Sequence, residues 1–421
     1  MLNPKPRNEL PLRPDDALPD DGRRAPAEPR SFAPRGAAVV ERSPGSVRAP
    51  WPRAWANLDP DALIRLPAEP ANAPAPLDEE SRRKRALIVI PCLNEAPLIA
   101  QVIGRILEDE ALVDPLVLVA DGGSTDGCRE IVADIAARDP RVRLMPNPRR
   151  LQSAGVNLAA RTIGEGRPWL VRIDAHAEYP KNYVSTLIAE ARRTGAHSVV
   201  VAMDTHGEGP FQRAVAAAQN SRLGTGGAAH RVGAAAGWVD HGHHALFNRE
   251  AFQQIGGYDE SFSHNEDAEL DLRLTQEGAK IWLTDRTRLV YHPRKTPGAL
   301  WKQYVSYGKG RARTVLKHYT PLKMRQALPL GVAPAVLGAL AAPLFWPLAI
   351  PALVWMLAAL AFGVALGAKQ KDRAVLLSGP AAMIMHLGWS LGFWMQLGTW
   401  LAHGAGRPAA GASMQTAAVA P

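Results

Sequence analysis

Cysteine is scarce in this chain, since Cys92 and Cys128 are the only two among 421 residues. Two thiols cannot build the framework of several disulfides that stabilises many small secreted domains. Their separation also lacks the short spacing of a metal-binding cysteine cluster. We therefore expect both cysteines to be free thiols without a metal.

Charge is absent from two long stretches, 326–368 and 374–406. A helix needs about 20 apolar residues to cross a bilayer, so the first stretch has room for two crossings and the second for one. A buried helix of a soluble protein is the alternative, but uncharged runs of this length favour membrane insertion. Pro343, Pro347 and Pro351 lie within the first run, where either a tight hairpin or a re-entrant turn is expected. We expect about three transmembrane helices within 327–403.

The flanks of these stretches predict an orientation. Nine Lys and Arg residues and no acid occur between 294 and 325, and the loop 369–373 is also basic. Positively charged loops stay on the cytoplasmic side, so the bulk of the chain should face the cytoplasm. Residues 296–326 are expected to form a basic amphipathic connector on the membrane surface. The side chains expected to face anionic headgroups are Lys302, Lys309, Arg311, Arg313 and Lys317.

The two ends of the chain lack a sustained apolar period. Residues 1–82 contain 16 of the 36 prolines. Such a composition cannot bury enough surface to offset the entropy lost on ordering, so we expect a disordered tail. No apolar core of signal-peptide type occurs there. Residues 404–421 are expected to form a second disordered tail.

Residues 83–295 have the alternating pattern of an α/β domain. Short apolar runs indicate buried strands at 86–91, 116–120, 142–145 and 169–173. Helical spacing follows each of them, at 98–107, 131–136, 153–163 and 183–192. Such alternation predicts a mostly parallel sheet with helices on both faces. Ligands bind such sheets beyond the carboxyl ends of their strands.

Polar clusters follow three of these strands: Asn94-Glu95, Asp121-Gly-Gly-Ser-Thr-Asp126 and Asp174-Ala-His176. Carboxylate and amide groups at strand ends can accept hydrogen bonds from a nucleotide base and ribose. Gly122 and Gly123 leave space for a close ligand. The alternative for 121–126 is a tight turn followed by a helix cap, which also describes many loops of this kind.

Asp174 and His176 are two residues apart on an extended segment, so their side chains point the same way. They can share one divalent ion. Carboxylate favours Mg²⁺ or Mn²⁺, and the imidazole nitrogen shifts the preference towards Mn²⁺. A structural histidine is the alternative.

A further acidic group, Asn265-Glu266-Asp267, opens a helix. Acids at this end of a helix complement its dipole. A carboxylate there can instead serve as a general base if it faces the ligand site. The sequence leaves both interpretations open.

In this order and spacing, the motifs resemble those of the family 2 inverting glycosyltransferases. The matching motifs are Pro91-x-x-Asn94-Glu95, Asp121 to Asp126, Asp174-x-His176 and Glu266-Asp267. The resemblance covers residues 86 to about 293 and implies a nucleotide-diphospho-sugar transferase (GT-A, Rossmann-like) fold. The strings 172–180 and 247–260 are similar to the succinoglycan-type exopolysaccharide glucosyltransferases of bacteria.

The resemblance also implies roles for single residues. Asp174 and His176 would hold Mg²⁺ or Mn²⁺, although many relatives have a second Asp at the position of His176. Asp267 would be the catalytic base, with Glu266 as the alternative. The residues that would bind the nucleotide sugar are Pro91, Asn94, Glu95, Asp121 and Asp174.

The implied reaction moves one sugar, glucose, from a UDP-sugar to a polyprenyl-diphosphate-linked saccharide. It would take place at the bacterial inner membrane, with the catalytic domain in the cytoplasm, membrane lipids as partners and no nucleic acid. The chain lacks the Gln-x-x-Arg-Trp motif of processive synthases, which argues for a single transfer. Alternatives are a polyprenyl-phosphate sugar transferase and a non-catalytic, membrane-anchored nucleotide-binding protein. Contacts with the acceptor or a phosphate are expected from Trp238, His292, Tyr307 and Arg311.

Overall fold

The computed structural model describes residues 77–163, 166–228, 231 and 235–403. The predicted N-terminal tail lies outside these residues except for 77–82, and the predicted C-terminal tail lies wholly outside them. Within 77–82, the short helix α2 (Glu79–Arg82) begins where the Asp78 carboxylate accepts a hydrogen bond from the Ser81 amide, 2.6 Å away.

One nine-stranded sheet forms the centre of the fold. Its first half is parallel, in the order β3-β2-β1-β4, and all four strands agree with the prediction. Their carboxyl ends therefore meet at one edge of the sheet. The bounds are β1 (Ala86–Cys92), β2 (Leu116–Asp121), β3 (Val142–Pro146) and β4 (Trp169–Arg172).

The second half of the sheet was not predicted. Strand β8 pairs antiparallel with both β4 and β6, and β9 pairs parallel with β6. Strands β5 and β7 are short and pair antiparallel with β9. The predicted mostly parallel sheet is therefore confirmed, with antiparallel insertions. The bounds are β5 (Ala177–Glu178), β6 (Ser198–Thr205), β7 (Gly237–Val239), β8 (His243–Asn248) and β9 (Ile281–Tyr291).

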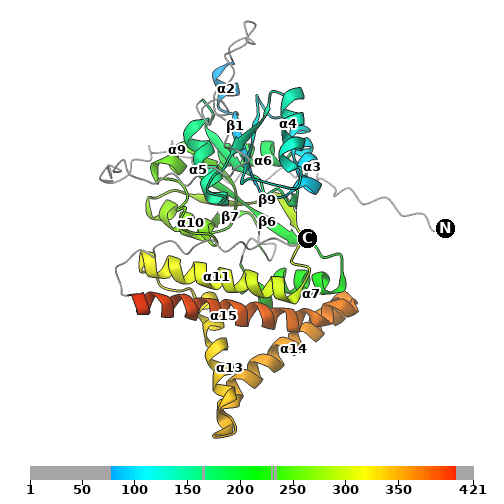
Figure 1. The fold of residues 1–421 in the computed structure, drawn as a ribbon, viewed down its shortest axis with the longest axis vertical. Helices are drawn as coiled ribbons and strands as arrows, with labels where there is room; N and C mark the ends of the chain where they lie inside the picture. Colours follow the sequence, from blue (N-terminus) through cyan, green and yellow to red (C-terminus); the bar gives the residue numbers. More distant parts are fainter. Residues whose placement is uncertain (1–76, 164–165, 229–230, 232–234, 404–421) are drawn as a thin grey trace, which may run out of the picture. The chain divides into compact units, whose positions relative to one another are not determined.

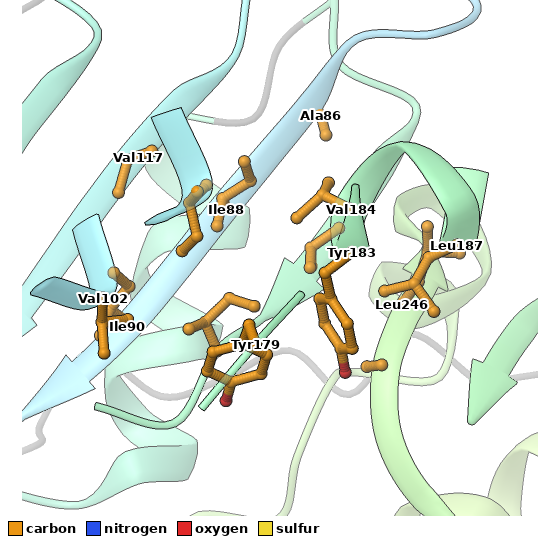
Figure 2. Packing of buried hydrophobic residues seen from close by; sticks show 14 of the residues in the cluster. Ala86, Ile88, Ile90, Val102, Val117, Tyr179, Tyr183, Val184, Leu187 and Leu246 are labelled. Carbon is orange, nitrogen blue, oxygen red and sulfur yellow. The ribbon is translucent and has the colours of Figure 1, made fainter. Parts of the chain in front are cut away.

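Helices cover the sheet and supply its core (Figure 1). Helix α3 begins with a proline in its first turn and buries its i, i+3, i+4 and i+7 face. Figure 2 shows Val102 of α3 near Ile90 of β1, and Val184 and Leu187 of α6 near Leu246 of β8. Full burial of each such side chain stabilises the fold by about 1.5–3 kcal/mol. The bounds are α3 (Ala96–Leu107), α4 (Cys128–Arg138), α5 (Gln152–Thr162), α6 (Tyr183–Thr194), α7 (Pro210–Gln219), α8 (Arg222–Thr225), α9 (Arg249–Gln254) and α10 (Glu266–Gln276).

The predicted apolar stretches form helices. Two continuous helical stretches, Trp346–Gln370 and Arg373–His403, are long and apolar enough to cross a membrane, whereas Met324–Leu340 is shorter. Helices α13 and α14 form a hairpin around the prolines of the first stretch, as Figure 1 shows. The bounds are α11 (Pro297–His318), α12 (Met324–Ala327), η2 (Leu328–Gly331), α13 (Val332–Leu340), η3 (Trp346–Ala349), α14 (Ile350–Gln370), η4 (Arg373–Leu377) and α15 (Ser378–His403).

Helix α11 lies side by side with α15 rather than alone on a surface (Figure 1). Gly308 of α11 faces the backbone of α15, and Gly392 of α15 faces the backbone of α11. The expected direction of the basic side chains is wrong for three residues, since Arg311 lines a cavity and two others contact the α/β domain. Arg313 donates to the Ser261 carbonyl, 2.8 Å away, and Lys317 contacts two carboxylates of the α/β domain. These two charges join α11 to that domain.

This close helix contact gives a testable prediction. Replacing Gly392 with Ala places a methyl group against the Val305 carbonyl and should lower the free energy of unfolding by about 1–3 kcal/mol. Gly398 lies on the same helix with open space around it, so Gly398→Ala should leave stability unchanged or raise it by up to about 1 kcal/mol. Thermal unfolding of the detergent-solubilised chain measures both. Equal shifts for the two variants would contradict the packing.

Candidate active site

Arg172, at the end of β4, brings together two of the predicted acidic clusters. Its side chain is buried, and its Nη1 atom lies 2.6 Å from Asp267 Oδ1. Its Nη2 atom lies 3.3 Å from Asp174 Oδ1, and Nη1 lies 3.7 Å from Glu266 Oε1. Because Arg172 and Asp174 are two residues apart, they extend to the same side of the chain. One guanidinium therefore links carboxylates that are far apart in the sequence.

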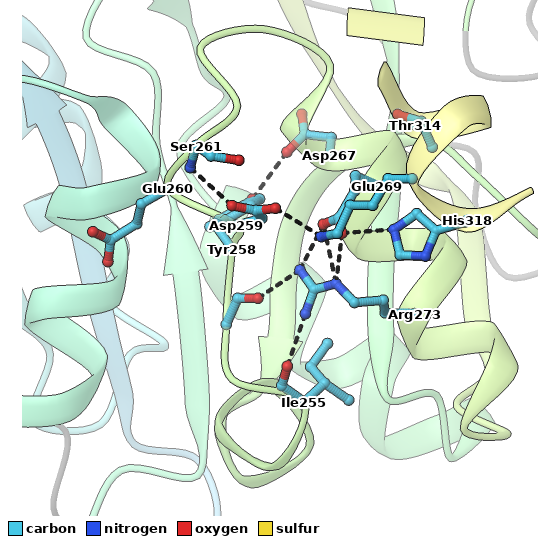
Figure 3. Close-up of polar contacts among 12 residues, drawn as sticks. Ile255, Tyr258, Asp259, Glu260, Ser261, Asp267, Glu269, Arg273, Thr314 and His318 are labelled. Carbon is cyan, nitrogen blue, oxygen red and sulfur yellow. Dashed lines mark hydrogen bonds and ion pairs between the residues drawn. The ribbon is translucent and has the colours of Figure 1, made fainter. Parts of the chain in front are cut away.

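Asp267 is held from a second direction by Tyr258, whose hydroxyl donates to Asp267 Oδ1 at 2.9 Å (Figure 3). The turn before Tyr258 requires glycine, since Gly257 has φ +69° and a Cβ there would collide with the Asn157 side chain. Asn157 bonds both the N–H and the C=O of Tyr258. The Gly-Gly-Tyr string thus fixes a side chain that orients Asp267.

The remaining acids of α10 have structural partners. Glu269 is fully buried and accepts hydrogen bonds from Arg273 and Lys317, with His318 2.9 Å away (Figure 3). Asp271 lies 2.7 Å from His241. These contacts fix α10 against its neighbours, so only Glu266 and Asp267 of this helix present carboxylates to the site.

Glu266 and Asp267 differ in their surroundings. Burial, together with the charge of Asp267, raises the pKa of Glu266 to about 7. Asp267 has the closer guanidinium contact of the two. Glu266, whose carboxyl group titrates near neutral pH, therefore lies next to Asp267, whose carboxylate pairs with Arg172.

Asp174 is surrounded by donors. Gln152 Nε2 lies 2.8 Å from its Oδ1, and His243 Nε2 lies 3.5 Å from its Oδ2. Burial alone would raise the pKa of Asp174, but the Arg172 charge holds it well below its usual range. Burial lowers the pKa of His243 to about 4, so this imidazole is neutral at pH 7. Asp174 is accordingly an ionised acceptor at neutral pH.

His176 is about half exposed (49%), and its Nδ1 lies 3.2 Å from Glu95 Oε1. That hydrogen bond raises the pKa of the imidazole. Among the described residues, no group of three or more His, Cys, Asp or Glu side chains could hold a metal ion. Mg²⁺ is usually bound by one or two protein carboxylates together with substrate phosphates and water. Metal binding by Asp174 and His176 therefore stays a prediction, in which they would supply two ligands beside those of a nucleotide diphosphate.

A cavity of about 990 Å³ opens onto these groups. Six of the predicted residues line it: Asp174, His176, Glu266, Asp267, Tyr307 and Arg311. The loop Asp240 to His244 contributes His241, Gly242 and His243 to the same wall. Residues after β4 and residues of α10 and α11 thus line one cavity.

The loops after β1 and β2 lie beside this cavity rather than in its wall, and they bond to each other. Asn94 Oδ1 accepts from the Thr125 amide at 2.8 Å, and the Asn94 amide donates to Ser124 Oγ at 2.9 Å. The Asp121 carboxylate accepts from the Gly123 and Ser124 amides. A turn therefore accounts for the hydrogen bonds of Asp121, and its nucleotide contact stays a prediction. Glu95 does not line the cavity, but its Oε1 atom lies 3.2 Å from Nδ1 of His176, which does.

Three other predicted residues are outside the cavity wall. Pro91 lies within β1, past the last residue of this strand that pairs with β4. Trp238, on β7, packs its half-exposed ring on Trp282, with ring centroids 5.0 Å apart. His292 Nε2 lies 2.8 Å from Glu178 Oε1. The expected roles of these residues remain predictions.

Sequence reasoning missed four side chains of the site: Gln152, Arg172, His243 and Tyr258. Two of them lie inside strings that were already singled out, since Arg172 precedes Asp174 by two positions and Tyr258 ends the Gly-Gly-Tyr turn. An arginine two residues before an aspartate at a strand end is a signal for an ion pair of this kind. His243 lies in the histidine-rich loop 240–244, whereas Gln152 carries no such local mark.

Cys92 and Cys128 are free, as predicted, and both are buried. Their sulfur atoms lie 3.0 Å apart, with Cys92 at the end of β1 and Cys128 at the start of α4.

Comparisons with known proteins agree with these motifs. Residues 87–256 match the family described as Glycosyl transferase family 2. The chain is 51% identical over 319 residues to the Succinoglycan biosynthesis protein ExoA of Rhizobium meliloti (strain 1021), covering 76% of this chain and 97% of that protein.

Two solved structures are similar at lower identity. The mannosyltransferase PcManGT from Pyrobaculum calidifontis, in complex with GDP-Man and Mn²⁺, is 20% identical with a TM-score of 0.49, over 72% of this chain and 86% of that one. GalNAc-T7 with UDP, GalNAc and Mn²⁺ is 16% identical with a TM-score of 0.38, over 55% and 47%.

Proposed function

The chain belongs to glycosyl transferase family 2, as a GT-A enzyme of the succinoglycan-biosynthesis type, and from this premise we propose its reaction. It moves one sugar, glucose, from a UDP-sugar to a polyprenyl-diphosphate-linked saccharide, with inversion at the anomeric carbon. The observation that carries the proposal is the contact of Arg172 with both Asp174 and Asp267 on one cavity wall. In this proposal, Asp267 is the base for the acceptor and Asp174 lies at the donor diphosphate, so the shared Arg172 contact keeps the two groups close together.

Asp267 acts as the general base in this proposal. It takes the proton from an acceptor hydroxyl, whose oxygen attacks the anomeric carbon on the face opposite the leaving diphosphate. Arg172 and Tyr258 keep the Asp267 carboxylate in one orientation. A fixed base of this kind contributes about 10²–10⁴-fold to the rate.

Asp174 and His176 face the donor diphosphate. They would hold Mg²⁺ or Mn²⁺, which neutralises charge on a departing diphosphate when it is bound. The neighbouring loops at Asn94, Glu95 and Asp121 hold the nucleotide from the adjacent strand ends. The hydrogen bonds between those loops support this arrangement, because they keep the strand ends at a fixed separation.

The site of action is the cytoplasmic face of the bacterial inner membrane. Helix α14 exposes large apolar side chains such as Leu353, Val354 and Leu357, which supports insertion. The basic flanks at 294–325 and 369–373 favour a cytoplasmic catalytic domain.

A membrane-fraction assay tests the function. Membranes containing the chain are incubated with a panel of labelled UDP-sugars, and lipid-linked products are extracted. We expect label in the lipid fraction from one donor, only when a lipid-linked saccharide is present. Label transferred to polyprenyl phosphate alone would favour the polyprenyl-phosphate transferase instead. No incorporation from any donor would favour a non-catalytic nucleotide-binding protein.

A further inference from the structure

The cavity that contains Asp174 and Asp267 continues to the C-terminal helices. Side chains of η2, α13, α14 and α15 line it there, and most of them are apolar. A nucleotide sugar is polar apart from the faces of its base, so it does not require an apolar compartment of this extent. The apolar part of the wall is formed by Leu328, Pro329, Val332, Trp355, Met385 and Trp389.

Two arginines between these regions, Arg311 and Arg325, make no close ion pair within the part of the chain that the structure describes. No carboxylate oxygen of the described residues lies within 4.0 Å of the guanidinium group of Arg311 or Arg325. Burial and the charge of Arg325 lower the pKa of Arg311 to about 10, against the opposing charges of Asp271 and Asp240, so Arg311 remains cationic at pH 7. Buried charges in proteins are normally paired. Two arginines in one cavity wall, with no described carboxylate at contact distance, therefore favour an anionic ligand.

Arg325 lies where the chain enters the first uncharged stretch. It is on α12, which continues through η2 into the apolar α13, and no charged residue follows it before Lys369. A basic residue at such a boundary lies at the level of lipid headgroups. An anion bound by Arg325 is thus at the depth of a lipid phosphate, next to the apolar part of the cavity.

Helix α11 supplies a hydrogen-bonding wall beside these arginines. Gln303, Tyr307 and Arg311 are four residues apart in succession, so they share one helix face. Gln303 Nε2 donates to the hydroxyls of Tyr291 and Tyr307, each at 3.0 Å. Gln303 Oε1 is buried with no partner among the described residues. Such a wall suits the hydroxyl groups of a sugar.

We propose that Arg311 and Arg325 bind the diphosphate of the isoprenoid-linked acceptor. The hydrocarbon chain lies against Val332 and Trp389, and the attached sugar lies along Tyr307 towards the base. Arg294, which also lines the cavity, then belongs to the donor side. This inference rests on the proposed function, because it assigns a site to the acceptor of that reaction.

Binding of radiolabelled farnesyl diphosphate to the full-length, detergent-solubilised chain tests the site. Wild type should bind the probe, and Arg311→Gln and Arg325→Gln should each weaken binding about tenfold, as expected for a lost charge-assisted hydrogen bond. Arg373→Gln is the matched control, since Arg373 begins η4 beside the apolar α15 and does not line the cavity. Its Kd should stay within about twofold of wild type. Arg311→Lys keeps the charge and should retain most of the affinity, which separates charge loss from misfolding.

Competition experiments decide the chemistry of the ligand. Farnesol and inorganic diphosphate should each compete far more weakly than unlabelled farnesyl diphosphate. Equal competition by inorganic diphosphate, equal binding of farnesol, or an equal loss in Arg373→Gln would overturn the inference. UDP-dependent sugar transfer without farnesyl diphosphate binding would overturn this site alone. Binding of the probe without transfer from any donor would overturn the proposed function and leave the site standing.

Discussion

Replacing Asp267 with Asn should reduce sugar transfer by about 10²–10⁴-fold while UDP binding stays within about twofold of wild type. Asn keeps the shape of the side chain and can still accept from Tyr258, but it cannot take a proton from the acceptor. Transfer from the labelled UDP-sugar measures the first effect, and equilibrium binding of UDP the second. Glu277→Gln is the matched control, because Glu277 is exposed at the other end of α10.

The same experiment separates Asp267 from its neighbour. If Glu266 were the base, transfer would rise with pH through a midpoint of about 7, as the raised pKa of Glu266 requires, and Glu266→Gln would remove that limb. If Asp267 is the base, Glu266→Gln keeps measurable transfer and Asp267→Asn does not. Loss of UDP binding in Asp267→Asn would mark it as a structural residue, and full activity would remove it from the mechanism.

Arg172→Met should lower the free energy of unfolding by about 3–5 kcal/mol and abolish transfer. The substitution leaves Asp174, Glu266 and Asp267 in one buried region without the cation they share. Arg172→Lys keeps the charge but cannot reach the carboxylates with a planar fork, so its effect should be intermediate. Thermal or denaturant unfolding in detergent and the transfer assay give the two readouts.

An exposed arginine provides the comparison. Arg288 pairs with Asp204 at 3.0 Å, but both side chains are more than one-third exposed. Such surface pairs contribute about 0–1 kcal/mol, so Arg288→Met should cost no more than that. Similar losses in Arg172→Met and Arg288→Met would show that the carboxylates do not depend on Arg172.

The first half of the sheet was predictable because its signals are local. Strands β1 to β4 are short apolar runs, and each is followed by a helix with 3.6-residue spacing. Strand β9 was missed because it carries Asp285, Arg286 and Arg288 within an otherwise apolar run. Its pairing with β6 also shifts in register between Thr284 and Arg288, which breaks the regular alternation of side chains. The antiparallel β8 depends on pairing with both β4 and β6, which no local pattern encodes.

The sequence by itself determined the strand-and-helix alternation, the polar residues at the strand ends and the uncharged C-terminal helices. Each of these follows from neighbouring residues, through side-chain periodicity, turn chemistry and the avoidance of charge in apolar surroundings. Only the tertiary structure decided that Arg172 joins Asp174 to Asp267, and that α11 lies between the α/β domain and α15. Contacts between residues nearly a hundred positions apart depend on how whole elements pack, and packing is a property of the folded chain rather than of any segment.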